Sequence, residues 1–303
     1  MTLIPVWWTV ATLLVLATLA ASAHGALAAR TVGASPGVGA LLPATETARL
    51  LRQERRTLLA ADSPLWRIGG AGLALIPLLM AAVVPLGPPA VLDSPIGIVW
   101  FNAADVVVWA LVWLLGWGAN STYALVGAFR FLATALAYEL PLMFALTTPA
   151  VAAGSLRVSD VVAAQSGLWY VVWMPVAFAI TLLGVVGFSV WGPLSPAAAP
   201  DLAGGVLAEL SGPDRLLAGA GRYLLLTAGS AFATALFLGG TQGPLLPGWM
   251  WMSLKTLVVV LALVAVRGRL VLLRPDRFLE VGWLVLLPLA LAQLLVVSLV
   301  VAS

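Results

Sequence analysis

The segment IGIVWFNAADVVVWALVWLLGW, residues 96–117, decides the fold. Its only charged side chain is Asp105, and polar residues do not alternate with apolar ones along it. A helix of ~20 residues crosses the ~30 Å hydrocarbon core of a bilayer, whereas a strand of a membrane barrel needs about 10 alternating residues. The segment therefore predicts a helix that spans a membrane.

Similar apolar segments recur through the chain. Of its 303 residues, 62% are hydrophobic and only 9% are charged, against about 25% charged in an ordinary soluble domain. Because backbone groups in lipid need internal partners, we expect an all-α, polytopic membrane protein with about eight transmembrane helices and one interfacial amphipathic helix. These form a single transmembrane domain over residues 1–303, with spans at 5–26, 67–87, 96–117, 123–152, 159–187, 217–239, 248–266 and 279–302.

Two connecting segments have compositions of their own. Residues 40–57 repeat leucines at helical spacing among arginines and glutamates, which predicts an amphipathic helix lying in the interface on the cytoplasmic side. Residues 188–215 are rich in Pro, Ala and Gly and predict a long cytoplasmic loop.

The arginines predict the orientation. Only Arg157 lies on the side that holds the second, fourth and sixth connections, and the other loop arginines lie on the opposite side. Because arginines mark the cytoplasmic side, we expect a multi-pass protein of a bacterial cytoplasmic membrane with both termini outside. This topology also accounts for the net charge of +3, so no nucleic acid partner is expected. The arginines on the predicted inner side are Arg30, Arg49, Arg52, Arg55, Arg56, Arg67, Arg215, Arg222, Arg267, Arg269, Arg274 and Arg277.

Several kinds of soluble chemistry are excluded or disfavoured. The chain has no cysteine, which excludes thiolate-held zinc and iron–sulfur clusters within it, and its one histidine, His24, disfavours a histidine metal site. It contains no phosphate loop and no nucleophile elbow. We therefore expect no metal site and no catalytic residue in this chain.

Ionisable residues inside the spans are the candidate functional residues, because each costs a few kcal/mol to insert. Glu139 stands two residues before Pro141, and the proline removes a backbone N–H donor next to the carboxylate. Two roles are open for Glu139: a hydrated group that exchanges protons, or a protonated carboxyl group that links helices. Asp105, among valines, is either a functional carboxylate or one buried hydrogen bond. Arg130 and Glu139 are separated by about 900° of helix rotation and should lie on opposite faces, unable to pair.

An ordered set of short segments resembles one family. GWGANSTYALVGAFR, residues 116–130, followed by YELP, residues 138–141, is similar to a signature of the H-type subunit of the bacterial proton-pumping NADH–quinone oxidoreductase, respiratory complex I. Each segment alone is weak, but the order and spacing are preserved over nearly the whole chain. Further similar segments are AGSL at 153–156, LSG at 210–212, TALFLGG at 234–240 and GWLVLLPLA at 282–290.

The resemblance implies a membrane-arm subunit that anchors a soluble electron-transfer arm and lines a quinone cavity and the start of a proton path. It implies no cofactor in this chain, quinone as substrate, FMN and iron–sulfur clusters on partner subunits, and other membrane and peripheral subunits as partners within the lipid bilayer. By this resemblance and their position in spans, the proton-path candidates are Glu139, Arg130 and Asp105. The quinone-loop or coupling-loop candidates are Asp160, Asp201, Glu209 and Arg222.

The chain departs from that family in one region. The family's loop between spans five and six is dense in carboxylates, whereas residues 187–201 read GFSVWGPLSPAAAPD, with Asp201 as their only acid. Arg222 stands where the family has a glutamate. Because alanine and proline cannot relay protons, two alternatives stay open: a subunit of a membrane-bound hydrogenase-type or related ion-translocating complex, and a structural or transport subunit without redox chemistry.

Overall fold

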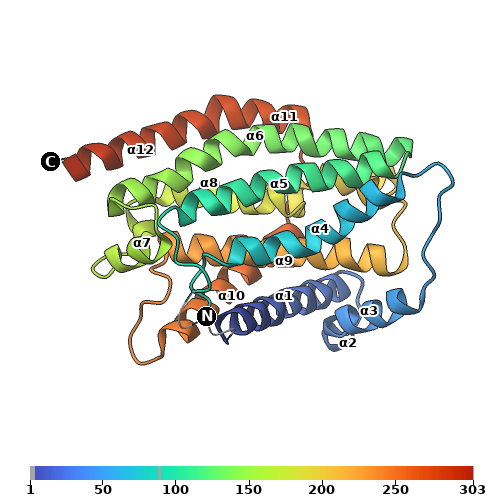
Figure 1. The fold of residues 1–303 in the computed structure, drawn as a ribbon, viewed down its shortest axis with the longest axis horizontal. Coiled ribbons are helices and arrows are strands. Elements are labelled where there is room, and N and C mark those ends of the chain that lie inside the picture. Colours follow the sequence, from blue (N-terminus) through green and yellow to red (C-terminus); the bar gives the residue numbers. More distant parts are fainter. Residues whose placement is uncertain (1–3, 88–89, 303) are drawn as a thin grey trace.

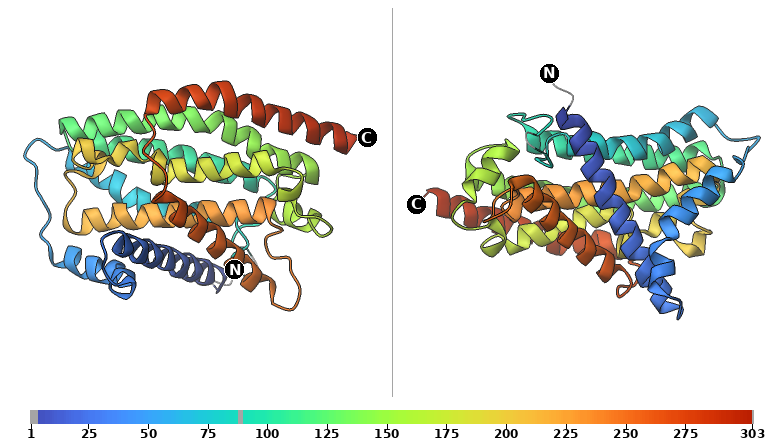
Figure 2. Two further views of the ribbon diagram at one scale, coloured as in Figure 1. Left: turned by 180° about the vertical axis from the view of Figure 1, so that it is seen from behind. Right: turned by 90° about the horizontal axis from the view of Figure 1, so that it is seen from below.

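The computed structural model describes residues 4–87 and 90–302, which form helices and turns without any strand. Within these residues, seven helices are long and apolar enough to cross a membrane. The expected all-α polytopic fold is confirmed. The seven are α1 (Ile4–Thr31), α4 (Ser63–Ala81), α5 (Gly97–Gly118), α6 (Thr122–Ala153), α9 (Gly212–Phe237), α10 (Gly248–Arg267) and the continuous segment Pro275–Ala302. Most of them run along the long axis of the molecule (Figure 1), and α1 and α10 cross the others at a slant (Figure 2).

The last of these segments is not a regular α-helix throughout. It consists of α11 (Pro275–Val281), a π-helical turn η6 (Gly282–Leu286) and α12 (Leu287–Ala302). A π-helical turn widens the helix locally and is frequent next to functional sites. This turn packs against the middle of α6.

The prediction of one continuous helix over 159–187 is wrong. The structure divides this region into α7 (Val158–Ala164), the 3-10 turn η1 (Tyr170–Val172) and α8 (Pro175–Phe188). Proline fixes its own backbone angle and disfavours helix at the preceding residue, so α8 begins at Pro175. At 14 residues, α8 is ~21 Å long, yet it packs between α6 and α9 and runs along them (Figure 1).

The chain passes back and forth between two ends of the bundle. The start of α1 and the end of α12 both point away from α2 (Pro36–Ala40) and α3 (Leu42–Arg52), as all three views show (Figures 1 and 2). Residues 82–87 and 90–96 and the connection after α6 lie at the end of the termini (Figure 1). We call the opposite end, which holds α2 and α3, the arginine-rich end.

The expected amphipathic helix is shorter than 40–57. The helix α3 ends at Arg52, and residues 53–62 form an extended connection to α4. Leu50 is buried where α3 packs against α1 and α9, while Arg49 and Glu46 face outward. Glu46 accepts hydrogen bonds of 2.7 and 2.5 Å from Arg49, and these bonds lower the pKa of the Glu46 carboxyl.

The segment predicted as a loop over 188–215 is compact. It contains four 3-10 turns between Gly192 and Leu207, and α9 begins at Gly212, earlier than the expected 217. The segment packs against α6, where a Cβ on Gly127 would lie 2.6 Å from the carbonyl oxygen of Ala197. Only glycine permits this approach, so the segment lies directly on the α6 backbone.

Candidate functional site

A cluster of polar side chains lies between α5 and α6, inside the bundle. Asn102 Nδ2 donates to Glu139 Oε1 over 3.0 Å. Asp105 follows Asn102 by one helical turn, on the same face of α5, and is fully buried, while Glu139 is 8% exposed. The carboxyl groups of Asp105 and Glu139 are close enough to interact electrostatically. Two of the three proton-path candidates, Asp105 and Glu139, therefore lie together.

Most of the polar atoms in this cluster lack a hydrogen-bond partner among the described residues. A buried polar atom left unpaired costs about 1–3 kcal/mol, so unpaired atoms gathered at one place indicate water or a shared proton between them. Chemically, the cluster can hold and exchange protons. The atoms without a bond to a group outside the cluster are Asp105 Oδ1 and Oδ2, Glu139 Oε2, Asn102 Oδ1, the Tyr138 hydroxyl and Trp109 Nε1. Among them, the carboxyl groups of Asp105 and Glu139 face each other, and the Trp109 indole lies beside the Tyr138 hydroxyl.

The backbone beside Glu139 is irregular. Pro141 has no N–H, so the carbonyl of Ala137 loses its partner within α6. The π-helical turn η6 covers this place: a Cβ on Gly282 would collide with that carbonyl oxygen, and Trp283 Nε1 donates to Leu136 O over 3.2 Å. The last transmembrane segment thus closes over the part of α6 that carries Glu139.

Arg130 does not pair with Glu139, as its position on the opposite face of α6 predicted. It forms a salt bridge of 2.8 Å with Asp201 from the segment before α9. Both residues line a cleft of 590 Å³ that also contains Arg274 and Asp276. The structure thus brings Arg130 and Asp201 together on the surface, apart from the buried carboxyl cluster.

Glu209 ties three segments together at the arginine-rich end. It accepts from Arg56 over 2.9 Å and from Ser121 over 3.0 Å. The backbone N–H of Arg56 also donates to Ser211 over 2.6 Å. These bonds join the connection before α4, the turn between α5 and α6, and the start of α9.

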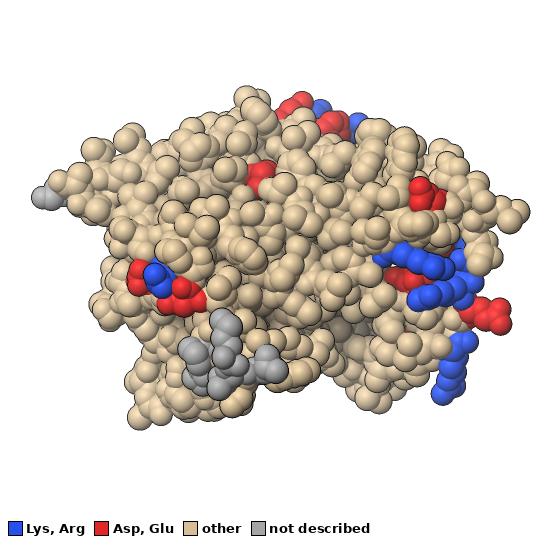
Figure 3. Space-filling model, viewed as in Figure 1, with Lys and Arg blue, Asp and Glu red and all other residues tan. Residues whose placement is uncertain are grey.

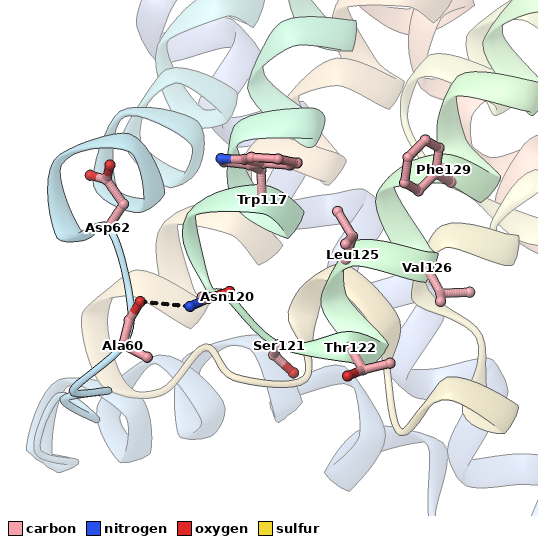
Figure 4. A pocket seen from close by; sticks show the side chains of 9 residues that line it. All are labelled: Ala60, Asp62, Trp117, Asn120, Ser121, Thr122, Leu125, Val126 and Phe129. Atoms are coloured by element: carbon pink, nitrogen blue, oxygen red, sulfur yellow. Dashed lines mark hydrogen bonds between the residues drawn. The ribbon is translucent and has the colours of Figure 1, made fainter.

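A second cleft of 510 Å³ opens beside this junction. Figure 4 shows its wall, where Asn120 Nδ2 donates to Ala60 O over 3.1 Å. Trp117 and Phe129 supply the aromatic side of the cleft, and Asp62 supplies a carboxylate. The cleft is open to its surroundings, and its lining mixes aromatic and polar side chains.

Asp160 lies away from the other loop candidates. It accepts from Ser155 over 2.7 Å, and it shares Arg157, 3.6 Å away, with Asp93. These residues lie at the end of the termini. In Figure 3 a small group of red and blue side chains at the left lies well away from the larger group, which contains several blue side chains, at the right. The structure therefore does not bring Asp160 together with Asp201 and Glu209.

Arg222 is partly buried, near the start of α9. It donates to the carbonyl of Val190, and its Nε is buried without a hydrogen-bond partner. It lies near Arg267 rather than near Asp201 or Glu209.

Lys255 on α10 is nearly buried and is held by backbone carbonyls. Its ammonium donates to Leu238 O and to Gln242 O, each over 2.7 Å, and lies 4.2 Å from the centre of the Trp169 ring. Three N–H groups of an ammonium are well matched to such carbonyls. Lys255 thus fixes the connection between α9 and α10.

The sequence reading missed Asn102 and Trp109 as members of the buried cluster. A signal was present, because Asn102, Asp105 and Trp109 follow one another at helical spacing and so share one face of a predicted span.

In residues 4–87 and 90–302, no group of three His, Cys, Asp or Glu side chains is placed to hold a metal ion.

The fold and the site together define a multi-pass helical membrane protein with an ionisable centre inside the bundle. Residues 1–298 match the family model described as NADH dehydrogenase. The chain is 38% identical over 269 residues to the NADH-quinone oxidoreductase H-subunit 2 of Geobacter sulfurreducens, an alignment that covers 85% of this chain and 82% of the relative. It is 37% identical to the H-subunit 1 of Geobacter metallireducens, with the same coverage. It is 36% identical over 258 residues to the H-subunit 2 of Cereibacter sphaeroides, covering 84% of this chain and 80% of that protein. The chain belongs to the NADH dehydrogenase family, as the resemblance predicted.

Proposed function

We propose that this chain is the H-type membrane-arm subunit of a complex-I-like NADH–quinone oxidoreductase. The observation that carries the proposal is the 38% identity to an H-type subunit over 85% of the chain. In this role the chain anchors the soluble arm, lines the quinone cavity and starts the proton path. Quinone is the substrate, and FMN and iron–sulfur clusters belong to partner subunits.

The buried carboxyl cluster supports the proton-path part of this proposal. Glu139 and Asp105 lie in the middle of spans, where an isolated charge is costly, and their unpaired oxygens need a proton or water. One proton shared by two neighbouring carboxyl groups meets that need and leaves the pair able to take up and release protons. Arg130 then acts at the surface, where it holds Asp201.

The arginine-rich end supports the anchoring part. It carries α2 and α3, the compact segment before α9 and both clefts. Because arginines mark the cytoplasmic side, this end faces the cytoplasm of a bacterial cell, and both termini lie outside. The soluble arm then docks on this end, and the quinone cavity opens near its clefts.

A second candidate function is favoured by the segment before α9. Among residues 188–207, Asp201 is the only acid, and its carboxylate is bound to Arg130. A proton relay through this segment lacks carriers. This observation favours a subunit of a hydrogenase-type or related ion-translocating complex, or a subunit without redox chemistry.

Identification of the subunits that co-purify tests these proposals. The tagged full-length chain is extracted in mild detergent, and the bound subunits are identified by mass spectrometry. Subunits with FMN and iron–sulfur sites together with NADH–quinone activity are expected. A large subunit with a nickel–iron site would support the hydrogenase-type alternative, and a complex without redox subunits would overturn both.

A further inference from the structure

A second polar cluster lies between α1, α9 and α10, near the arginine-rich end. Its centre is Trp191, whose ring is 4.6 Å from the Arg267 guanidinium and 5.3 Å from the His24 ring. Tyr223 lies 5.0 Å from Trp191. Arg222 reaches the same place, since it donates to Val190, the neighbour of Trp191.

The hydrogen bonds in this cluster show which atoms donate. Arginine can only donate, and Arg267 Nη1 lies closer to His24 Nε2 than to Nδ1, which is 3.2 Å away, so we assign Nε2 as the acceptor. The other ring nitrogen then carries the proton and donates to the Tyr223 hydroxyl oxygen over 2.7 Å. The hydroxyl proton of Tyr223 is left free to donate elsewhere. The cluster thus consists almost entirely of donors.

The cluster contains two cations and no anion. Among residues 4–87 and 90–302, no carboxylate lies within salt-bridge distance of Arg222 or Arg267. The two guanidinium groups repel each other, and Arg222 Nε is buried without a partner. Cations that are partly shielded from water are costly unless they are paired, so an anion from outside the chain would stabilise this cluster.

The surroundings of the cluster indicate where the counter-charge comes from. Arg267 shares a face of α10 with the buried Val260 and Val264, whereas Leu261 (37% exposed) and Val266 (43% exposed) lie on the outer, apolar side of this helix. The cluster therefore lies just inward of an apolar surface that can face lipid. Basic pockets between transmembrane helices on the cytoplasmic side bind phosphate-bearing lipid headgroups. Guanidinium groups bind phosphate oxygens with paired N–H donors.

We propose that Arg222, Arg267 and Tyr223 bind a phosphate group, supplied by the headgroup of an anionic phospholipid. The phosphate neutralises the two guanidinium groups and accepts from the Tyr223 hydroxyl. Phosphate binding at this site can be tested without any redox activity, because it requires only that the chain lie in a bilayer.

Thermal unfolding of the full-length chain in bilayer discs tests the site. Three preparations are compared: phosphatidylcholine alone, phosphatidylcholine with phosphatidylglycerol, and phosphatidylcholine with inorganic phosphate in the buffer. A ligand that binds only the folded chain raises its melting temperature. We expect phosphatidylglycerol to raise Tm by on the order of 2–4 °C or more and inorganic phosphate to have less effect. An equal rise with inorganic phosphate would keep the phosphate site but identify a free anion as its source.

Three variants show whether the effect comes from this cluster. Arg222→Glu supplies an internal counter-charge for Arg267, so it should remove the response to phosphatidylglycerol without lowering Tm in phosphatidylcholine. Arg267→Gln should reduce the response, and it decides the matter if the first variant does not fold. Arg269→Gln, an exposed arginine at the same end, is the matched control and should retain the response. The proposal is overturned by the absence of any lipid effect, by full retention of the effect in Arg267→Gln, or by equal loss in Arg269→Gln.

Discussion

Glu139 on α6 accepts a hydrogen bond of 3.0 Å from Asn102 on α5 through one carboxyl oxygen, while its other oxygen is buried and unpaired. The amide fixes the orientation of the carboxyl group and leaves one oxygen facing the similarly unpaired Asp105. A group held in this way can exchange a proton without turning its side chain. This relationship is the basis of the first two predictions.

Replacement of Glu139 by glutamine should abolish coupled proton movement and leave assembly intact. Glutamine keeps the size of the side chain and still accepts from Asn102 through its amide oxygen, but it cannot release a proton. The measurement is proton uptake by inverted membrane vesicles, with subunit content checked in parallel. Glu46→Gln, at an exposed position on α3, serves as the control. Unchanged proton movement in Glu139→Gln would remove this residue from the path.

Replacement of Asp105 by asparagine should separate stability from proton transfer. The amide adds N–H donors beside Glu139 Oε2 and the other unpaired acceptors, so the melting temperature should stay the same or rise. Proton movement should fall, because the neighbouring pair loses one of its two carboxyl groups. A large drop in melting temperature would show instead that the Asp105 carboxyl is needed for packing. In that case, the variants Asn102→Asp and Asn102→Ala would show whether Asp105 depends on Asn102 for its packing.

Much of this architecture is predictable because it depends on local composition. A run such as residues 96–117 has to form a helix in lipid whatever its neighbours are. The interruption of the fifth expected span was not predicted, since residues 168–174 stay apolar and only the short stretch QSG at 165–167 and Pro175 mark the break. Segment composition gives the length of an apolar region but not the point at which a helix stops within it.

The candidate site was predictable only in part, for a different reason. A single charge within a span, such as Glu139 or Asp105, stands out from its sequence. The partner of that charge depends on which spans pack together, and the tertiary structure decides this. His24 and Arg267 are 243 positions apart and contact each other; nothing local to either residue predicts the contact.

The salt bridge between Arg130 and Asp201 should contribute little to stability. The Asp201 side chain is 59% exposed, and exposed ion pairs typically contribute about 0–1 kcal/mol. A double-mutant cycle with Arg130→Gln and Asp201→Asn should therefore give a coupling free energy within that range, measured by thermal unfolding in bilayer discs. A larger coupling would indicate that the cleft between them is closed off from solvent when the chain lies in a membrane.

Replacement of Lys255 by methionine should loosen the connection between α9 and α10. Methionine keeps the length of the side chain but leaves the carbonyls of Leu238 and Gln242 without their donor, at a cost of about 1–3 kcal/mol. We expect a lower melting temperature and faster proteolysis within residues 238–247. Ser253→Ala on the same helix is the control, because its hydroxyl bonds only within α10. Equal protease sensitivity in both variants would show that Lys255 does not hold this connection.

The orientation is open to a direct labelling experiment, because the chain has no cysteine of its own. Leu59→Cys and Leu245→Cys each place one thiol at a fully exposed position, the first at the arginine-rich end and the second in the connection between α9 and α10. If the arginine-rich end faces the cytoplasm, a membrane-impermeant maleimide should label Leu245→Cys in intact cells and Leu59→Cys only in inverted vesicles. Neither leucine packs against the bundle, so neither change should alter the fold. Labelling of Leu59→Cys from outside intact cells would reverse the topology and remove the soluble arm from that end.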